Sequence, residues 1–156
     1  MRRIDALSKI KDVNADSSQS YGSMYAQCGY DGDINTMWHS ASQAGWCQIQ
    51  FDAPREISRV TSVIAQFGQA VSVDYELRGS LDGKEWFVLC PWKTVEHREP
   101  LLWIYDDVAL AQAVNAKYVR TFIRHARMKK GGMNDVLLYE QYFNAEALPE
   151  ELGQKH

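Results

Sequence analysis

Hydrophobic and polar residues alternate along much of this chain with the period of two that is typical of half-buried β-strands. From Trp46 to Phe51, the apolar Cys47, Ile49 and Phe51 alternate with glutamines. Further segments alternate in the same way or are rich in the β-branched and aromatic residues that suit a pleated surface. The additional strands are predicted at residues 57–64, 75–80, 85–89, 101–105, 117–123 and 136–143.

Turn signals separate these segments at intervals of about ten residues. Residues 52–56 contain a proline and predict a turn, and Asp82-Gly83 predicts a hairpin because glycine tolerates a positive φ. Residues 108–114 are the one internal helix candidate, and residues 1–12 are weakly helical in pattern. Many short strands with turns between them predict an all-β fold, an antiparallel β-sandwich or barrel.

A chain of 156 residues is long enough for one domain with its own core. We expect an N-terminal extension over residues 1–12, a β-sandwich domain over residues 13–144 and a polar, frayed C-terminal tail over residues 145–156. The composition, 46% hydrophobic and 24% charged, is that of a globular protein. The net charge of −3 argues against nucleic acid as a partner, and no apolar run reaches the roughly 18 residues of a membrane span.

The N-terminus carries positive charge but no apolar stretch behind it, so the sequence predicts no secretory signal. Two localisations stay open: an extracellular module within a longer secreted chain, or a cytoplasmic protein.

The three cysteines, Cys28, Cys47 and Cys90, lack the spacing of a metal site. Cys47 and Cys90 lie in apolar segments and are expected to be buried free thiols, while a disulfide with Cys28 stays open.

The segment from Tyr30 to Ser40 concentrates oxygen-bearing side chains. Asp31, Asp33 and Thr36 suit calcium, which takes six to eight oxygen ligands. The segment opens like an EF-hand loop, but Thr36 replaces the glycine of the sixth position and a serine replaces the glutamate of the twelfth. In the alternative interpretation, the two aspartates only make side-chain-to-backbone bonds in a turn.

Several motifs occur in the order that one family shows. The chain resembles the F5/8 type C (discoidin-like) domains, and within them the carbohydrate-binding modules of family 32, over roughly residues 12–144. The resemblance implies a galactose-binding-like jelly-roll β-sandwich, usually non-catalytic and often appended to a secreted glycoside hydrolase. The motifs that carry it are residues 15–18 (ADSS), 31–40 (DGDINTMWHS), 45–60 (GWCQIQFDAPREISRV), 75–86 (YELRGSLDGKEW), 116–120 (AKYVR) and 138–143 (LYEQYF).

The resemblance also implies a structural calcium ion. In the family, the acidic loop binds it together with a glutamate of the last strand, and Glu140 matches that position. The implied ligands are Asp31, Asp33, Thr36 and Glu140, with a backbone carbonyl from Cys28 or Tyr139.

For the ligand site, the resemblance points to His39, which matches a position that often bonds a sugar hydroxyl. The alternative is a turn histidine satisfied by neighbouring backbone. The loop after residues 57–64 has neither the arginine nor the asparagine of the family's galactose binders. In their place, Gln66 or Gln69 is a candidate hydrogen-bond donor, and Phe67 is a candidate platform for a sugar ring.

A basic loop follows the strand at residues 117–123. Arg124 and Arg127 lie in a stretch with no acidic residue, and Asn134 follows. Such a loop fits an anionic ligand such as a uronic or sialic acid, held by charge-assisted hydrogen bonds. The alternative is a solvated basic loop without a ligand.

No catalytic motif is found in the sequence. Asp106 and Asp107 form an acidic pair, but neighbours in a strand point to opposite faces and make a poor catalytic pair. Together with the absence of a catalytic motif, the resemblance predicts a non-catalytic carbohydrate-binding module with a structural calcium, appended to a larger protein, whose glycan ligand is a galactose-type or acidic sugar. A protein–protein interaction or adhesion module on the same fold is the alternative.

Overall fold

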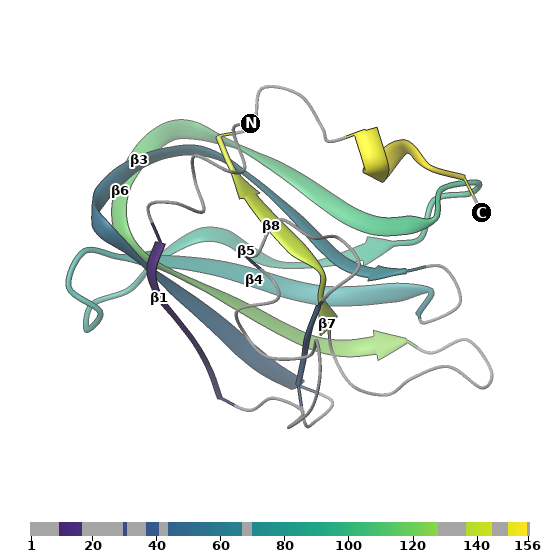
Figure 1. Ribbon diagram of the computed structural model, residues 1–156, viewed down its shortest axis with the longest axis horizontal. Coiled ribbons are helices and arrows are strands. Elements are labelled where there is room, and N and C mark those ends of the chain that lie inside the picture. Colours follow the sequence, from purple (N-terminus) through teal and green to yellow (C-terminus); the bar gives the residue numbers. More distant parts are fainter. Residues whose placement is uncertain are drawn as a thin grey trace.

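Two long strands organise the structure. The computed structural model describes residues 10–16, 30, 37–40, 44–66, 70–127, 137–144 and 150–155, apart from the side chains of residues 125–127 and 151. Strands β3 (Ala44–Gln66) and β6 (Trp103–Arg127) pair antiparallel over most of their length. Both bend sharply near their middles, on the left of Figure 1, where the register shifts between Gln50 and Arg55.

Because of this bend, each long strand contributes to two layers. In the first layer the strand order is β1–β3–β6–β4–β5, and in the second the returning half of β3 pairs with β6 on one side and β8 on the other. A two-stranded ribbon, β2–β7, joins segments that are far apart in sequence. The remaining strands are β1 (Ile10–Ala15), β2 (Trp38–His39), β4 (Ser72–Ser80), β5 (Phe87–Glu96), β7 (Leu137–Leu138) and β8 (Glu140–Phe143).

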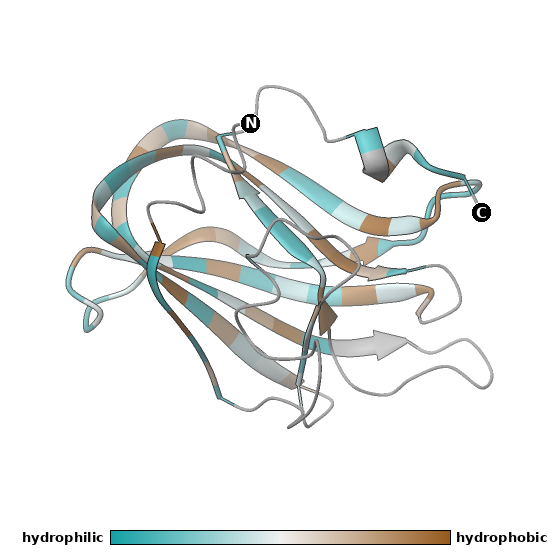
Figure 2. Ribbon diagram, viewed as in Figure 1, coloured by the Kyte–Doolittle hydropathy of each residue, from teal (hydrophilic) through white to brown (hydrophobic). Residues whose placement is uncertain are grey.

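The core lies between the layers and follows the predicted alternation. Cys47, Ile49 and Phe51 are buried, as their spacing predicts, and Figure 2 shows apolar and polar bands alternating along β3. Trp38 is fully buried in the same core. The predicted all-β jelly-roll sandwich is confirmed.

Two local predictions are wrong. Residues 108–114 form no helix but lie within β6, where Val108 pairs with Val60 and Val114 with Ile57. Residues 52–56 form no separate turn but continue β3 through its bend. In both places, pairing with a distant strand overrides the local preference. Residues 10–12, in the weakly helical stretch, begin β1 instead.

The Asp82-Gly83 hairpin between β4 and β5 is confirmed. Gly83 has φ +77°, and Oδ1 of Asp82 accepts hydrogen bonds from the backbone N–H groups of Lys84 (2.8 Å) and Glu85 (2.9 Å). These bonds hold the pKa of Asp82 below its usual value.

The last described residues are not frayed. A short 3₁₀ helix, η2 (Glu150–Gly153), places Leu152 in a second apolar cluster that includes Trp103 and Tyr139. A backbone hydrogen bond of 2.8 Å joins the Leu102 N–H to the Gln154 carbonyl. One apolar side chain thus anchors a segment that is otherwise polar.

Cys47 and Cys90 are buried free thiols, as predicted, and burial raises the pKa of Cys47 to about 12. Cys28 lies outside the described residues. Within the described part of the chain, no helix is both long and apolar enough to cross a membrane.

Candidate functional site

The termini of β3 and β6 meet at the end of the sandwich opposite the bend (Figure 1). There Ala44 pairs with Arg124, and Gln66 pairs with Trp103. We call this region the loop end, because the connections around residues 40–44, 66–72 and 127–137 start or finish there. Gln66, Arg124 and the backbone of Arg127, three predicted ligand residues, therefore lie at the same end of the fold.

Arg124 is the best-defined of these residues. Its guanidinium lies 3.7 Å from the ring centroid of Trp92 on β5, a cation–π contact. Its Nε is buried and has no hydrogen-bond partner among the described residues. Stacking fixes the plane of the guanidinium, and a planar fork held in this way suits a carboxylate.

His39 lies in β2, opposite Leu137 of β7. The residue is only 6% exposed, so little of it is open to a ligand. The predicted sugar contact at His39 thus stays a prediction. Phe67, Gln69 and Asn134 lie outside the described residues, as does the side chain of Arg127.

The region of the predicted calcium site is built around β8. Glu140 is fully buried, and Tyr30 is tied to its neighbour Gln141 by a hydrogen bond of 2.8 Å from the phenol to Oε1. Burial raises the pKa of Tyr30 well above its usual value, and the charges of Cys47 and Glu140 add to that effect. The residue that immediately precedes the acidic segment is therefore tied to β8 at Gln141, the neighbour of Glu140 in sequence.

The other end of the acidic segment is anchored nearby, because Trp38 pairs with Leu138 of β7. Two described residues that flank residues 31–36, Tyr30 and Trp38, are thus held by β8 and β7 respectively. A buried carboxylate is a hard oxygen ligand of the kind that calcium prefers, so the described part of the region fits the ion. Asp31, Asp33, Thr36 and Cys28 lie outside the described residues, and the described ones alone contain no cluster of three or more metal-binding side chains.

Gln141 completes a buried polar network that the sequence did not indicate. Its Nε2 donates to Oγ of Ser62 (2.9 Å) and to Oγ1 of Thr121 (2.8 Å), while its Oε1 accepts from Tyr30. The amide therefore joins β3, β6 and β8 to the start of the acidic segment. A glutamine among strand residues gives no signal of its partners in sequence.

Asp106 and Asp107 point in opposite directions, as predicted. Asp106 accepts hydrogen bonds from the Tyr75 hydroxyl and from Lys93, the latter at 3.1 Å. Asp107 accepts from Arg59 and Thr61, and the Arg59 guanidinium holds the pKa of Asp107 below its usual value. Each carboxylate serves its own structural contacts.

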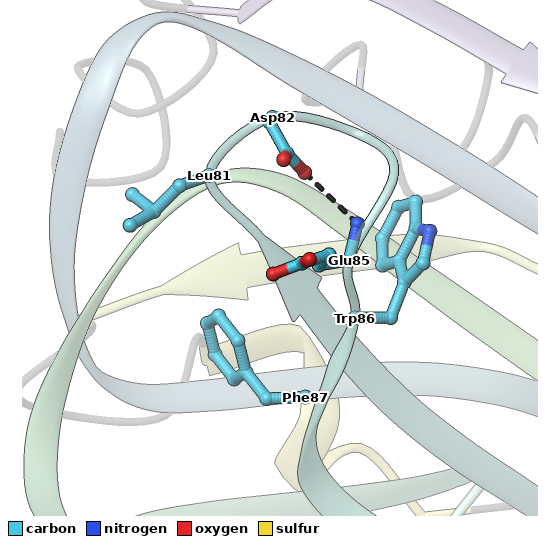
Figure 3. Close-up of a pocket in the computed structure, with 5 residues that line it drawn as sticks. All are labelled: Leu81, Asp82, Glu85, Trp86 and Phe87. Atoms are coloured by element: carbon cyan, nitrogen blue, oxygen red, sulfur yellow. Dashed lines mark hydrogen bonds between the residues drawn. The ribbon is translucent and has the colours of Figure 1, made fainter.

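A cavity of about 350 Å³ lies at the β4–β5 hairpin, on the left of Figure 1 and far from the loop end. Its five lining residues all belong to the hairpin, and Figure 3 shows the Asp82 carboxylate turned toward the backbone N–H of Glu85. That carboxylate is used by the turn itself. The lining residues are Leu81, Asp82, Glu85, Trp86 and Phe87.

Comparison with known proteins agrees with this architecture. The family model of the F5/8 type C domain matches residues 12–137, and the chain belongs to that family. No curated protein sequence matches the chain.

Solved structures of carbohydrate-binding modules share the fold. A pectin-binding module is similar with a TM-score of 0.73 and 23% identity, covering 90% of this chain and 95% of the other. A family 32 module of a family 31 glycoside hydrolase from Clostridium perfringens has a TM-score of 0.69 and 22% identity, covering 88% and 91%. The family 32 module of AlyQ, in complex with 4,5-unsaturated mannuronic acid, has a TM-score of 0.65 and 12% identity, covering 88% and 96%.

Proposed function

We propose that this protein is a non-catalytic carbohydrate-binding module that holds an acidic glycan at the loop end. The observation that carries the proposal is Arg124, whose guanidinium is stacked on Trp92 while its Nε has no partner among the described residues. A carboxylate of a sugar acid would pair with the exposed part of that guanidinium through charge-assisted hydrogen bonds. The family membership and the shared fold support carbohydrate binding as the class of function.

Two structural neighbours support an acidic ligand, while another is in complex with galactose. One is described as pectin-binding and another is in complex with an unsaturated mannuronic acid. The loop after β3 also has no arginine or asparagine. In our proposal Arg124 and Arg127 hold the carboxylate, His39, Gln66, Gln69 and Asn134 bond hydroxyls, and Phe67 packs on the sugar ring.

We further propose that a calcium ion holds residues 31–36 against β8. Glu140 would bind it together with Asp31, Asp33 and Thr36, and a carbonyl of Cys28 or Tyr139 would complete the set. The anchoring of Tyr30 on Gln141 supports this assignment. Such an ion would fix the loop that carries His39 and would take no part in chemistry.

The relative from a family 31 glycoside hydrolase supports a further proposal: this module belongs to a longer, extracellular chain that acts on polysaccharide. The module would then concentrate that chain on its substrate.

A glycan array probed with the wild-type protein tests the proposed function. We expect binding to uronic or sialic acid glycans, lost in Arg124→Gln and weakened in His39→Ala. Arg98→Gln is the matched control, because Arg98 is an exposed arginine that stacks on Tyr105 in the other layer. Thermal melts check that each variant is folded.

Two results would overturn the proposal. Binding to neutral galactosides alone, unchanged in Arg124→Gln, would exclude the acidic ligand. No bound glycan at high protein concentration would exclude the carbohydrate function and favour the protein-interaction module.

A further inference from the structure

The first layer has an outer face, the side turned away from the core, with an unusual set of side chains. On β6 the core side is formed by Val119, Thr121 and Ile123, all buried. The residues between them point outward and are partly exposed. These are Tyr118, Arg120, Phe122 and Arg124.

Arginines and aromatic rings form a series of cation–π contacts across this face. The guanidinium carbon of Arg120 lies 4.3 Å from the ring centroid of Trp46 and 4.5 Å from that of Trp86. Arg78 lies 5.3 Å from the centroid of Phe122. Together with Arg124 on Trp92, these contacts extend from β3 to β5.

The five tryptophans of the chain are divided between the core and this outer face. Trp38 and Trp103 are buried, at 0% and 4% exposure. Trp46, Trp86 and Trp92 are partly exposed, and all three contact arginines of the outer face. Solvent-facing tryptophan is thus confined to one surface.

The positive charges on this face are not all balanced. Arg78 is paired with Glu76, at 2.6 Å between Nε and Oε1, whereas Arg120 donates both of its hydrogen bonds to the neutral Oε1 of Gln48, at 2.8 and 2.6 Å. Neither Arg120 nor Arg124 has an ion pair with another described residue. Burial and the charge of Arg78 lower the pKa of Arg120, which marks a cation that lacks a counter-charge.

Asp74 is the other acidic residue beside these arginines in the sheet. It lies opposite Arg124 in register and keeps its negative charge there, but its Oδ1 accepts a 2.6 Å hydrogen bond from Thr94 and it forms no ion pair with Arg124. The guanidinium groups of Arg120 and Arg124, which form no ion pair with a described residue, are four residues apart on one strand face, about 13 Å at the usual strand rise. They form a line that starts at the loop end and runs toward the middle of the sheet.

We propose that the outer face binds an acidic polysaccharide chain that continues from the loop end across β6. Carboxylate or sulfate groups of the chain would pair with Arg124 and Arg120, and its sugar rings would pack on the exposed parts of Trp46, Trp86 and Trp92. This inference rests on the proposed function, because the ligand is an acidic glycan. The outer face would be a second binding surface that contacts several sugar residues of one chain. Polymers would therefore bind more tightly than single sugars.

Acrylamide quenching of tryptophan fluorescence tests this inference on the unmodified protein, with Trp46, Trp86 and Trp92 as the accessible rings. Polygalacturonate should protect them from the quencher, and added salt should reverse the protection. A neutral galactan at the same mass concentration should not protect them. If polygalacturonate binds but the quenching stays unchanged, the outer face is not the site.

Variants of Arg120 give an independent test by calorimetry. Arg120→Gln should weaken binding of polygalacturonate about tenfold or more, as expected when a hydrogen bond to a charged group is lost. Arg120→Lys keeps the charge and should recover part of the affinity. Binding of galacturonic acid itself, at the loop end, should not change in either variant, and Arg98→Gln should match the wild type with both ligands.

The outcomes separate the two proposals. If galacturonic acid binds, but the polymer binds no tighter and Arg120→Gln has no effect, the inference fails and the proposed function stands. If neither ligand binds, the proposed function fails together with the inference. If a single-stranded oligonucleotide protects the tryptophans better than polygalacturonate does, the class of ligand assigned to this face is wrong.

Discussion

The phenol of Tyr30 donates a 2.8 Å hydrogen bond to Oε1 of Gln141, which lies 111 residues further along the chain. Both side chains are buried, and the Gln141 amide is also bonded to Ser62 and Thr121. A single amide therefore fixes the start of the acidic segment to three strands.

Loss of the Tyr30 hydroxyl should be costly for this reason. Tyr30→Phe leaves Oε1 of Gln141 buried without a donor, and we expect it to lower the free energy of unfolding by about 1–3 kcal/mol. Urea denaturation measures this change. Tyr105→Phe is the control, because Tyr105 is partly exposed and water can solvate that site. Equal effects of the two substitutions would contradict a structural role for the Tyr30–Gln141 bond.

Calcium should stabilise the fold if Glu140 and the acidic segment bind it. Calcium at one hundred times its Kd contributes about 2.7 kcal/mol, which corresponds to a Tm increase of about 5–10 °C for a domain of this size. Differential scanning fluorimetry with EDTA and with excess calcium measures the increase, and Glu140→Gln should abolish most of it. Identical melts of the wild-type protein in the two buffers would exclude the ion.

The Asp107–Arg59 pair predicts a dependence of stability on pH. Its hydrogen bonds with Arg59 and Thr61 lower the pKa of Asp107 in the folded protein. The pair therefore stabilises the fold above the unfolded pKa of about 3.9, and this contribution is lost as the pH falls through the lower folded pKa.

Asp107→Asn should accordingly be less stable than the wild type at pH 7, and the two proteins should converge below about pH 3. Urea unfolding at both pH values measures the difference. Asp52→Asn, on the exposed bend of β3, should change little at either pH. A deficit of the Asp107→Asn protein that persists unchanged in acid would show that the ion pair is not its cause.

Leu152 tests whether the C-terminal segment belongs to the folded unit. Because the side chain is fully buried against Trp103 and Tyr139, Leu152→Ala should cost about 2–5 kcal/mol in the free energy of unfolding. Leu81→Ala, at a side chain that is 54% exposed, should stay within about 0.5 kcal/mol of the wild type. Chemical denaturation compares the two, and equal stability of both variants would contradict the docking of η2.

Much of the sheet could be predicted because strand alternation is a local property. The inward positions of Cys47, Ile49 and Phe51 follow from the period of two, and the Asp82-Gly83 turn follows from the φ that only glycine adopts easily. The outer face left a weaker signal. Trp46 and Phe122 occupy positions that alternation assigns to solvent, and large aromatic rings at such positions mark a surface with a further role.

Other features had no local signal. Residues 108–114 look helical in isolation, and only their pairing with β3 holds them extended. Asp106 and Asp107 could be assigned to opposite faces, but their partners Tyr75 and Arg59 could not be named. The grouping of Gln66 with Arg124 depends on the fold-back of two strands, because these residues are far apart in sequence.

The sequence by itself determined the class of fold, the family, the buried thiols and the types of side chain that carry the proposed chemistry. These features depend on periodicity, composition and motif order, which are properties of the linear sequence. The tertiary structure decided the bend of β3 and β6, the docking of Leu152, the contact of Tyr30 with Gln141 and the stack of Arg120 between Trp46 and Trp86. These depend on which distant segments pair and in what register, and the free energy of that pairing comes from contacts that no local segment contains.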